Sequence, residues 1–541
     1  VISGNTITYN TVGLYTITVT ATRNATPNCV TTETILVNVY DLSSCNETRE
    51  KVMVTQEGWG SVPVLFISGI VSNRPNAIDN DLSTHSTITI PVGLLGLGTT
   101  WQNLRFDHTV TKGTPVTVKV GQEYSAVQVG GGVTIQALDA AGKTIGPLLA
   151  AGDGALLDLL VGDNVFEYTF IPKNSNGVAV DYSGVRIVVG STVAVANNAK
   201  VFGAFYEKKK TIDVNNPTCN TIGNVVSGAS KPSDYVGNVT LNPLVDDVLW
   251  GVEDIGLGVA SSLASIVHPY LAVDKDLESF AIFNKSVAAL NRQKLTVKFN
   301  QVARPGDQVR IIMGGFEVPV LDLSLLTDIK VQRYLGNLKV GPQINGSQFK
   351  VLDLNLLALL GSTGNRKALI VDAINEPFDR VELTYLSTVQ VGLLGDYTYI
   401  YDISIKPKLI FDGGNGIIDS TNSGSGSSSA TNLCAGDFLR IEKPDPCTSY
   451  QVSFANATKD GDGNITSFTD ISNSSLALVR ETGNMAFYEF NSLHATHKDN
   501  LYIKIQTYRQ GCPYAEPIYL PVNLLNCKDA IVNPVLKLST K

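Results

Sequence analysis

Two pairs of aspartates, each separated by one residue, are the clearest candidate metal ligands in this chain. Asp79 and Asp81 lie in the heptapeptide AIDNDLS, and Asp274 and Asp276 lie in AVDKDLE, which begins 195 residues later. Alternating carboxylates in a turn can surround Ca²⁺, a hard ion that takes about six to eight oxygen ligands. The same spacing is typical of an Asx turn, in which the aspartate side chains accept hydrogen bonds from nearby backbone N–H groups. The turn is the favoured interpretation, and calcium is the alternative.

Two other stretches carry potential ligands but fit plain loops better. The segment KDGDGN (459–464) has the spacing of the first half of a calcium loop, but it lacks the later Gly and Glu, and Asp-Gly is a strong hairpin-turn signal. His494, His497 and Asp499 lie in a polar stretch between expected strands. No nucleophile-elbow, zinc-protease, P-loop or dinucleotide motif occurs outside a Gly/Ser-rich segment. We therefore expect no enzyme activity and no cofactor other than the calcium considered above.

The repeated heptapeptide belongs to a duplication that covers the centre of the chain. Other segments recur in the same order at similar distances. The matching pairs are KGTPVTVKVG (112–121) with RPGDQVRIIMG (304–314), VTIQAL (133–138) with IKVQRYL (329–335), and DYSGVRIVV (181–189) with PFDRVELTY (377–385). An echo at a fixed distance marks a duplicated structural unit. We expect two copies of one module, 46–212 and 213–408, each long enough for a jelly-roll-like β-sandwich.

The two ends of the chain resemble each other. Leu14–Cys45 and Leu501–Cys527 both contain two alternating strands, a Cys-bearing hairpin, a last strand and a closing Cys. We expect a complete immunoglobulin-like domain over 432–528 and the C-terminal half of such a domain over 1–45. Residues 409–431 are rich in Gly and Ser and are predicted to be a flexible linker. Residues 529–541 are read as the start of another unit or as a linker.

Composition favours an all-β chain of tandem β-sandwich domains. Hydrophobic residues make up 43% and charged residues 17% of the sequence, a balance typical of β-branched strands joined by polar turns. The net charge of −8 argues against a nucleic-acid partner, which requires clustered Lys and Arg. The only basic run, Lys208–Lys210, is interpreted as a solvated strand end. No apolar stretch reaches the roughly 18 residues that a membrane-spanning helix needs.

The last four cysteines are expected to form two disulfides. If the first and last strands of the immunoglobulin-like domain run parallel, Cys434 before the first strand shares an end with Cys512 before the last. Cys447 then shares the other end with Cys527. We prefer these two pairs among the three possible connectivities.

The first three cysteines are harder to pair. Cys29 and Cys45 are expected to bond to an upstream half-domain, which leaves Cys219 single, and a Cys45–Cys219 bridge is the alternative. Disulfides are typical of extracellular proteins. With no initiating Met and no signal-peptide pattern, the chain is interpreted as a piece of a longer secreted polypeptide.

The order of these parts resembles the giant repetitive cell-surface adhesins of Bacteroidetes, the gliding-motility type exported by type IX secretion. The similarity lies in the units GLYTITVTAT (13–22) and NLCAGDFLRI (432–441), and in the module segment NRPNAIDNDLSTHSTITIPVGLLGLG (73–98). This resemblance implies a secreted, surface-anchored filament that binds surfaces, polysaccharides or other cells and has no catalytic activity.

The repeated turn is also similar to the N-A-x-D-G-x-x-x-T opening of discoidin-like, galactose-binding jelly rolls. In that family the aspartate region can hold structural calcium. Asn80 stands where that motif has Gly, and the second copy carries no Thr at the position of Thr84. In addition, Asp419-Ser420-Thr421 fits a short O-glycosylation acceptor pattern of Bacteroidetes.

Three functional hypotheses follow. The first is an extracellular, multi-domain spacer and adhesive surface within a longer chain. The second is a pair of calcium-dependent carbohydrate-binding modules, for which exposed aromatic platforms at Trp101 and Trp250 would speak, whereas burial of both would favour the spacer. The third is a fibre subunit that assembles by strand exchange, because the chain begins with a half-domain.

Overall fold

The computed structural model describes the greater part of the chain. The described residues are 2–3, 6–7, 13–23, 29–39, 45, 47–63, 68–90, 98–124, 133–150, 161–190, 197–213, 224–227, 237–242, 244–254, 265–284, 291–304, 306–314, 326, 328–353, 367–374, 376–387, 397–407, 410–413, 416–419, 431–434, 438–443, 447–461, 465–482, 485–490 and 500–525.

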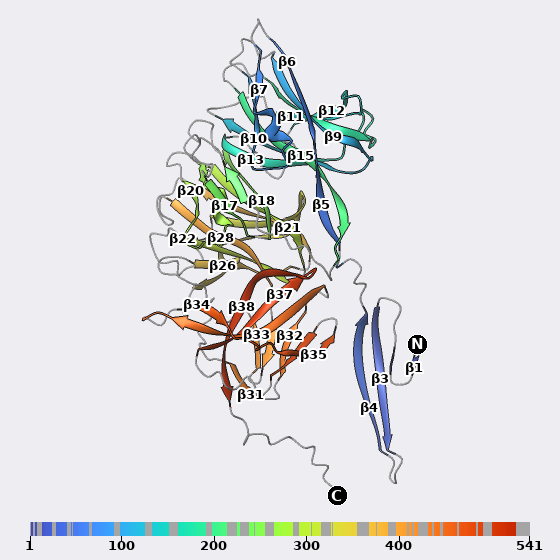
Figure 1. The fold of residues 1–541 in the computed structure, drawn as a ribbon, viewed down its shortest axis with the longest axis vertical. Helices are drawn as coiled ribbons and strands as arrows, with labels where there is room; N and C mark the ends of the chain where they lie inside the picture. Colours follow the sequence, from blue (N-terminus) through green and yellow to red (C-terminus); the bar gives the residue numbers. More distant parts are fainter. Residues whose placement is uncertain are drawn as a thin grey trace.

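Regular structure in these residues consists of β-strands and three short 3₁₀ helices, η2 (Arg74–Ala77), η4 (Pro269–Ala272) and η6 (Gly346–Gln348). The expected all-β fold class with tandem β-sandwiches is therefore confirmed (Figure 1). No helix in the part that the structure describes is long and apolar enough to cross a bilayer.

One large sheet runs through both copies of the module. Its strands are, in order, β24 (Leu338–Asn345), β23 (Ile329–Leu335), β27 (Phe378–Ser387), β21 (Asn291–Ala303), β18 (Val245–Asp254), β13 (Val161–Phe170), β10 (Val116–Tyr124), β15 (Asn197–Thr211), β8 (Ser86–Ile90) and β7 (Ile70–Ser72), and β5 (Glu47–Met53) also pairs with β15.

Each module closes its sandwich with a second sheet. In module 1 the order is β12 (Thr144–Ala150), β11 (Val133–Leu138), β14 (Tyr182–Gly190), β9 (Thr99–Val110) and β6 (Gln56–Val62). In module 2 it is β19 (Ser265–Val267), β20 (Ala281–Asn284), β28 (Tyr397–Pro407), β22 (Asp307–Gly314), β26 (Lys367–Val371) and β25 (Lys350–Asp353). The strands alternate buried and exposed residues, as in β8, because one face of each sheet packs on the core.

The strand orders of the two modules correspond. The order β7-β8-β15-β10-β13 of module 1 matches β19-β20-β28-β22-β26 of module 2, and β6-β9-β14-β11-β12 matches β18-β21-β27-β23-β24. Three of the four sequence echoes fall on matching strands, namely β10 with β22, β11 with β23 and β14 with β27, and the fourth falls on the turns that follow η2 and η4. The segments predicted to be two copies of one module therefore have corresponding strand orders.

The two modules are joined edge to edge, through strands that do not correspond. β13 of module 1 pairs antiparallel with β18 of module 2, which is the counterpart of β6. The cores also interlock at this seam, since Val165 and Phe202 belong to the module 2 core and Tyr334 belongs to the module 1 core. Sheet and core are therefore continuous between the modules.

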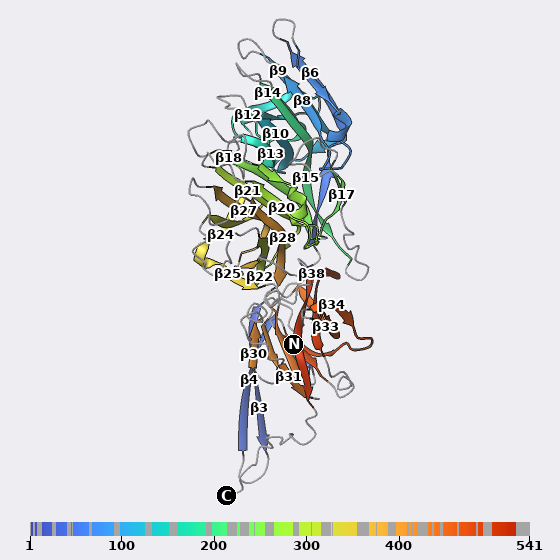
Figure 2. The same ribbon diagram turned by 90° about the vertical axis from the view of Figure 1, so that its left-hand side faces the viewer.

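A third sandwich follows, stacked on module 2 (Figures 1 and 2). The strand order of its first sheet is β30 (Gly416–Asp419), β29 (Ile410–Gly413), β32 (Phe438–Glu442), β36 (Met485–Glu489) and β35 (Ala477–Thr482). The strand order of its second sheet is β31 (Thr431–Cys434), β38 (Cys512–Leu525), β37 (Leu501–Arg509), β33 (Thr448–Lys459) and β34 (Ile465–Asp470). The first strand of the second sheet, β31, pairs parallel with the last, β38, as expected for an immunoglobulin-like domain.

This domain begins earlier than predicted. Residues 410–419, which the sequence assigned to a linker, form the hairpin β29–β30, and β29 pairs with β32. The sequence predicted a linker because glycines dominate the composition of FDGGNGIID. Those glycines form the turn of the hairpin, and the apolar residues Phe411 and Ile418 pair across its two strands. The rest of the predicted linker, 420–430, lies outside the described residues.

Three two-stranded sheets complete the fold: β1 (Ile2–Ser3) with β2 (Thr6–Ile7), β3 (Gly13–Arg23) with β4 (Cys29–Val39), and β16 (Asn224–Ser227) with β17 (Gly237–Thr240). Among the described strands, β3 and β4 pair only with each other, and they lie at the same end of the molecule as the third sandwich (Figures 1 and 2). In the region 1–45, which the sequence assigned to half of an immunoglobulin-like domain, the longest described feature is thus the hairpin β3–β4.

Candidate functional site

The aspartate pair of module 1 forms an Asx-type turn between η2 and β8. Asp79 Oδ1 accepts a hydrogen bond from the Asp81 backbone N–H at 2.9 Å, and Asp81 Oδ1 accepts one from the Ser83 N–H at 2.8 Å. The Thr84 hydroxyl lies 2.7 Å from Asp79 Oδ2, 3.2 Å from the Asp81 carbonyl and 3.3 Å from the Asn76 carbonyl. A hydroxyl has one proton, so these acceptor oxygens outnumber the donors at this point.

The turn of module 2 repeats this arrangement. Asp274 Oδ1 accepts from the Asp276 N–H at 3.0 Å, and the Ser279 hydroxyl lies 2.6 Å from Asp274 Oδ2 and 3.0 Å from the Asp276 carbonyl. Ser279 stands 195 residues after Thr84, so the second copy lacks the Thr, as the sequence indicated, but keeps a hydroxyl at the same position. Burial raises the pKa of Asp274 to about 6.

The backbone at both turns is also the same. The residues before η2 and η4, Asn73 and His268, have φ of 51° and 54°, and the residues between the aspartates, Asn80 and Lys275, have φ of 66° and 68°. Left-handed backbone at non-glycine residues is uncommon and costs free energy. Both copies therefore share the same turn geometry. Within the described residues, no three His, Cys, Asp or Glu side chains form a metal site, so a cation here would rely on carbonyl and hydroxyl oxygens as well.

The two tryptophans singled out from sequence differ in environment. Trp250 is 3% exposed and packs edge-on against Tyr270 in the module 2 core. Trp101 points to the outer face of the second sheet of module 1 and is partly exposed. Its ring lies across Gly60, where a Cβ would come within 2.3 Å of the ring. Trp250 is therefore not an exposed aromatic platform, and Trp101 is only partly exposed.

Polar groups surround Trp101 on this outer face. The Arg186 guanidinium carbon lies 5.2 Å from the ring centroid, and Arg186 Nε donates to Asn103 Oδ1 at 2.8 Å. An indole with fixed hydrogen-bonding groups beside it can hold a planar or ring-shaped polar ligand, because the ring supplies apolar contact and the neighbours supply donors and acceptors.

The seam between the modules buries a cluster of opposite charges. Glu167 on β13 accepts hydrogen bonds from Lys298 Nζ at 3.2 Å and faces Arg380 Nη2 at 3.1 Å, and Lys119 Nζ lies 2.6 Å from Asp247 Oδ2. All five side chains are buried. Because Glu167 and Lys119 belong to module 1 and the other three to module 2, every one of these pairs crosses the seam.

The carboxyl at the centre of this cluster is strongly perturbed. Burial alone would raise the pKa of Glu167, but the charges of Lys298 and Arg380 outweigh burial and hold the pKa at about 2. Burial alone would lower the pKa of Lys298, but the carboxylates of Glu167 and Asp246 outweigh burial and raise it. Glu167 and Lys298 are therefore both ionised in the folded state at neutral pH.

A second buried ion pair fixes the third sandwich to module 2. Arg509 on β37 donates to both carboxylate oxygens of Asp307 on β22, at 2.7 and 2.9 Å, and Tyr514 donates to Asp307 at 3.0 Å. The Arg509 guanidinium carbon also lies 3.9 Å from the Tyr514 ring centroid. Bidentate geometry of this kind fixes the relative orientation of the two partners as well as their contact.

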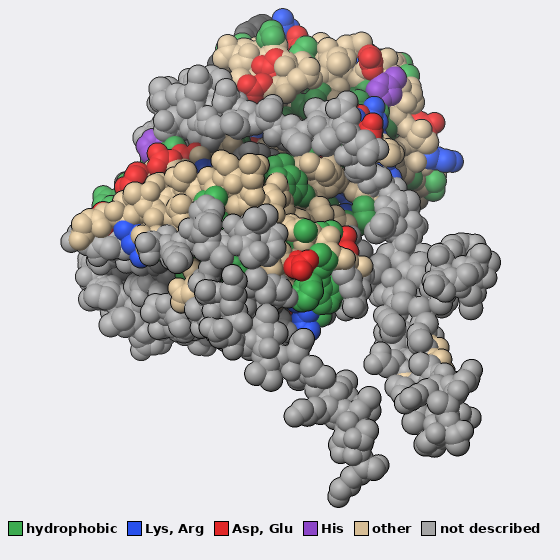
Figure 3. All heavy atoms as spheres, turned by 60° about the horizontal axis from the view of Figure 1, so that its bottom comes forward, with side chains coloured by type: hydrophobic (Ala, Val, Ile, Leu, Met, Phe, Trp, Pro, Cys, Tyr) green, Lys and Arg blue, Asp and Glu red, His purple; other side chains and the backbone are tan. Residues whose placement is uncertain are grey.

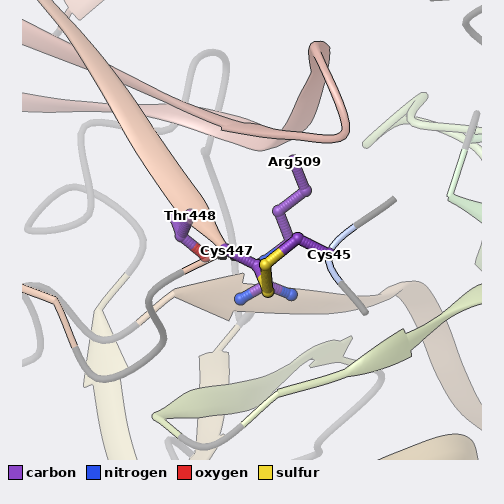
Figure 4. Close-up of a disulfide and its surroundings, with 4 residues drawn as sticks. All are labelled: Cys45, Cys447, Thr448 and Arg509. Carbon is purple, nitrogen blue, oxygen red and sulfur yellow. Dashed lines mark hydrogen bonds between the residues drawn. A yellow bond between two sulfur atoms is a disulfide. The ribbon is translucent and has the colours of Figure 1, made fainter. Parts of the chain in front are cut away.

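A disulfide joins Cys45 to Cys447, 402 residues apart (Figure 4). Cys45 lies two residues before β5 of module 1, and Cys447 immediately precedes β33 of the third sandwich. Arg509 lies beside the bridge and donates to the Thr448 hydroxyl at 3.0 Å. The expected Cys447–Cys527 pair and the expected upstream partner of Cys45, as well as its alternative partner Cys219, are therefore wrong.

The other expected disulfide fails on register. Cys434 ends β31 opposite Leu525, whereas Cys512 begins β38 at the far end of the same long strand. Cys434 does precede β32, the strand that the sequence predicted between Cys434 and Cys447, but it is also the last residue of β31, a strand that the sequence did not predict. Cys512 is disulfide-bonded, to a residue outside the described part. Side chains at Cys29, Cys219 and Cys527 also lie outside it.

The remaining candidates carry little chemistry. His494, His497, Asp499 and the second half of KDGDGN, residues 462–464, lie outside the described residues. In the basic run, Lys208 and Lys210 lie 3.3 and 3.5 Å from Glu50 at the solvated end of β15, as expected. On the face shown in Figure 3, acidic and basic side chains of the described residues are interspersed and form no patch of one sign.

The charged residues of the seam were not predicted from the sequence. Lys119, Glu167 and Lys298 each interrupt an apolar strand, in VTVKVG, VFEYTF and LTVKFN. A charge in the middle of a buried strand is a signal of a buried partner, since an unpaired charge there would be very costly. Their partners could not be named, because which strands meet at the seam is a property of the packed modules.

Comparison with known proteins gives no assignment. No family model matches the chain, and no curated protein matches it. Solved structures that align with it include the CBM32-1 and CBM32-2 domains of ZmpB from Clostridium perfringens, at 11% identity over 68% of this chain and 98% of that one, with a TM-score of 0.17.

The CBM22 tandem of Xyn10C from Paenibacillus barcinonensis aligns at 10% identity over 65% of this chain and 93% of that one, with a TM-score of 0.17. Allantoicase from Saccharomyces cerevisiae aligns at 9% identity over 59% and 80%, with a TM-score of 0.18. Overlays this poor carry no argument, so function is argued from the geometry alone.

Proposed function

We propose that this chain is a rigid, non-catalytic spacer segment of an extracellular surface protein, of the adhesin kind that its sequence resembles. The observation that carries the proposal is the joining of three sandwiches into one body. A continuous sheet and a buried charge cluster join the modules, and the Asp307–Arg509 pair and the Cys45–Cys447 disulfide secure the third sandwich. Independent binding domains on flexible linkers need none of these links.

Extracellular location is part of the proposal. A disulfide that closes 402 residues persists only where thiols stay oxidised. The buried charges also argue for a structural role, because at the seam each ionised side chain is engaged by the opposite module and is not displayed to a substrate.

The test is the solution shape of the full oxidised chain. Small-angle X-ray scattering should fit one elongated particle of fixed dimensions. Glu167→Gln should broaden the distribution of particle lengths, and Glu50→Gln, on the surface of β5, should not. A wild-type chain whose scattering requires independently moving domains would contradict the spacer role.

A second candidate function is carbohydrate binding, which the outer face around Trp101 favours. Sugar rings stack their C–H faces on an indole and bond to flanking amide and guanidinium groups, which Asn103 and Arg186 supply. Calorimetric titration of the full chain with soluble polysaccharides tests this candidate. Trp101→Ala should abolish binding, whereas Phe438→Ala, which removes an exposed aromatic from the third sandwich, should leave it intact.

We also propose that the two repeated turns bind Ca²⁺. In module 1 the oxygens of Asp79, Asp81, Thr84 and Asn76 converge on one point, and in module 2 those of Asp274, Asp276 and Ser279 do so. Water would complete the roughly six to eight ligands of the ion. Thermal unfolding in CaCl₂ against EDTA tests the proposal, since a ligand of the folded state raises its stability.

Variants make this test specific. Asp274→Asn should remove most of the module 2 contribution to the calcium effect. Asp139 provides a matched control, because it forms an Asx turn with the backbone of Ala141 and Lys143. Asp139→Asn should leave the calcium effect unchanged. If both variants lost the calcium effect equally, the repeated aspartates would be turn residues and not calcium ligands.

A further inference from the structure

In module 1 the edge strand β6 has the same sequence feature as β18, the module 2 strand that forms the seam. β6 and β18 occupy corresponding positions, beside β9 and β21, and both contain a Trp-Gly pair, Trp59-Gly60 and Trp250-Gly251. Trp59 pairs with Gln102 and Trp250 with Leu295, and both of these residues are buried on the core side of the sheet. The two tryptophans are therefore structural counterparts.

Their exposure differs because their neighbours differ. Trp250 is 3% exposed, since β13 of module 1 lies alongside β18 and its Val165 is the register partner of Trp250. Trp59 is 42% exposed, and Val62 on the same strand is 51% exposed. Among the described strands, β6 pairs with β9 alone. The outer edge of β6 thus corresponds to the edge of β18 that pairs with β13 at the seam, but no described strand pairs with it.

The other sheet edges of the two modules are protected against pairing. Exposed edges are commonly blunted by shortness, Lys or Pro. β7 and β19 have three residues each. The remaining edges carry such residues: Lys51 in β5, Pro147 in β12, Lys339 and Pro342 in β24, and Lys350 in the four-residue β25. β6, with seven residues in the sequence QEGWGSV, has no Lys and no Pro.

We propose that β6 is a docking edge on which a second copy of this chain pairs antiparallel through its own β6. In that second copy β13 is already paired with β18, and the corresponding edge of module 2, β26, is covered by β25. β6 is thus the only unprotected edge of the described module sheets that it can offer. A strand paired antiparallel with its own copy has two-fold symmetry, the commonest closed assembly.

The residues of β6 suit this pairing. A register centred on Trp59 places Glu57 opposite Ser61 of the other molecule, so no like charges meet. One oxygen of Glu57, Oε1, also lies 3.5 Å from Arg74 Nη1, so its charge is balanced within its own chain. The edge lies at the end of the molecule farthest from the third sandwich, so two copies can meet there end to end (Figures 1 and 2). The inference does not depend on what the modules bind.

Analytical ultracentrifugation of the full oxidised chain tests the proposal. One strand pair is a small interface, so we expect a monomer near 1 µM and a dimer near about 100 µM. Trp59→Lys and Val62→Lys should each weaken the dimer about tenfold or more. Leu338→Lys, at a 71% exposed position on the β24 edge, should not.

Hydrogen exchange locates the contact. The amides of β6 should exchange more slowly at high than at low concentration, while those of β24 and β12 do not change. Since neither β6 variant removes a buried residue, both should keep the wild-type circular dichroism spectrum. A chain that stays monomeric at the higher concentration, a dimer that survives both β6 variants, or protection of another edge would overturn the proposal.

Discussion

The Cys45–Cys447 disulfide predicts that modules 1 and 2 are shielded from mechanical load. Residues before Cys45 and residues after Cys447 are connected directly through the bridge, and the 402-residue separation between them forms a side loop. Tension applied across the chain therefore passes from β4 through the disulfide into β33. The seam, the repeated turns and the Trp101 face would keep their folded geometry while the chain is stretched.

The magnitude follows from the length of the bypassed loop. An extended chain spans about 3.3–3.6 Å per residue, so 402 residues correspond to about 1,400 Å of hidden contour length. Single-molecule stretching with handles at Thr32 and Gly461, both exposed, measures this quantity. The oxidised chain should release only the short segments between each handle and its cysteine. After reduction the released length should increase by about 1,400 Å.

The double variant Cys45→Ser/Cys447→Ser isolates this bridge from the disulfide of Cys512. It should unfold module 1 under tension without any reductant, whereas the wild type should not. If the oxidised wild-type chain released its modules at the same force as the double variant, the disulfide would not lie on the load path, and the reasoning would be refuted.

Three other predictions concern the buried charges and the calcium turns. Glu167→Gln leaves Lys298 and Arg380 without their carboxylate, so chemical denaturation should show a loss of about 3–5 kcal/mol, against less than about 1 kcal/mol for Glu50→Gln on the surface. The pKa of Glu167 is about 2 in the folded chain and 4.5 when unperturbed, so its stabilising contribution is complete above about pH 4.5 and lost as pH falls toward 2; Trp250 fluorescence should report this transition, and Glu167→Gln should flatten it. Because the pKa of Asp274 is raised to about 6, protons compete with calcium there, and the calcium-induced rise in melting temperature should be larger at pH 7.5 than at pH 5, a difference that Asp274→Asn should reduce.

Local patterns were sufficient to predict the modules. The echoes around Asp79 and Asp274 and the alternation of strands such as β8 follow from short-range sequence, and they identified the duplication and the all-β class. Contacts between modules were not predictable in this way. Cys45 and Cys447 are adjacent only because three sandwiches stack, and Trp59 is distinguished from Trp250 only by whether another strand lies beside it.

The seam itself owes its specificity to side chains more than to backbone pairing. β13 and β18 share only the pairs Val161 with Val252 and Val165 with Trp250, and the register is irregular between them. In that interval the Asn164 side chain accepts the Val252 N–H at 2.8 Å, replacing a strand hydrogen bond. Because so few backbone pairs join β13 to β18, backbone pairing alone would allow many other strand edges to bind there. A partner without cations opposite Glu167 would, however, bury an unpaired carboxylate at a cost of several kcal/mol. The charge cluster therefore selects which edge may close the seam, and β6, which lies outside that cluster, remains open to a partner chosen by shape and apolar contact alone.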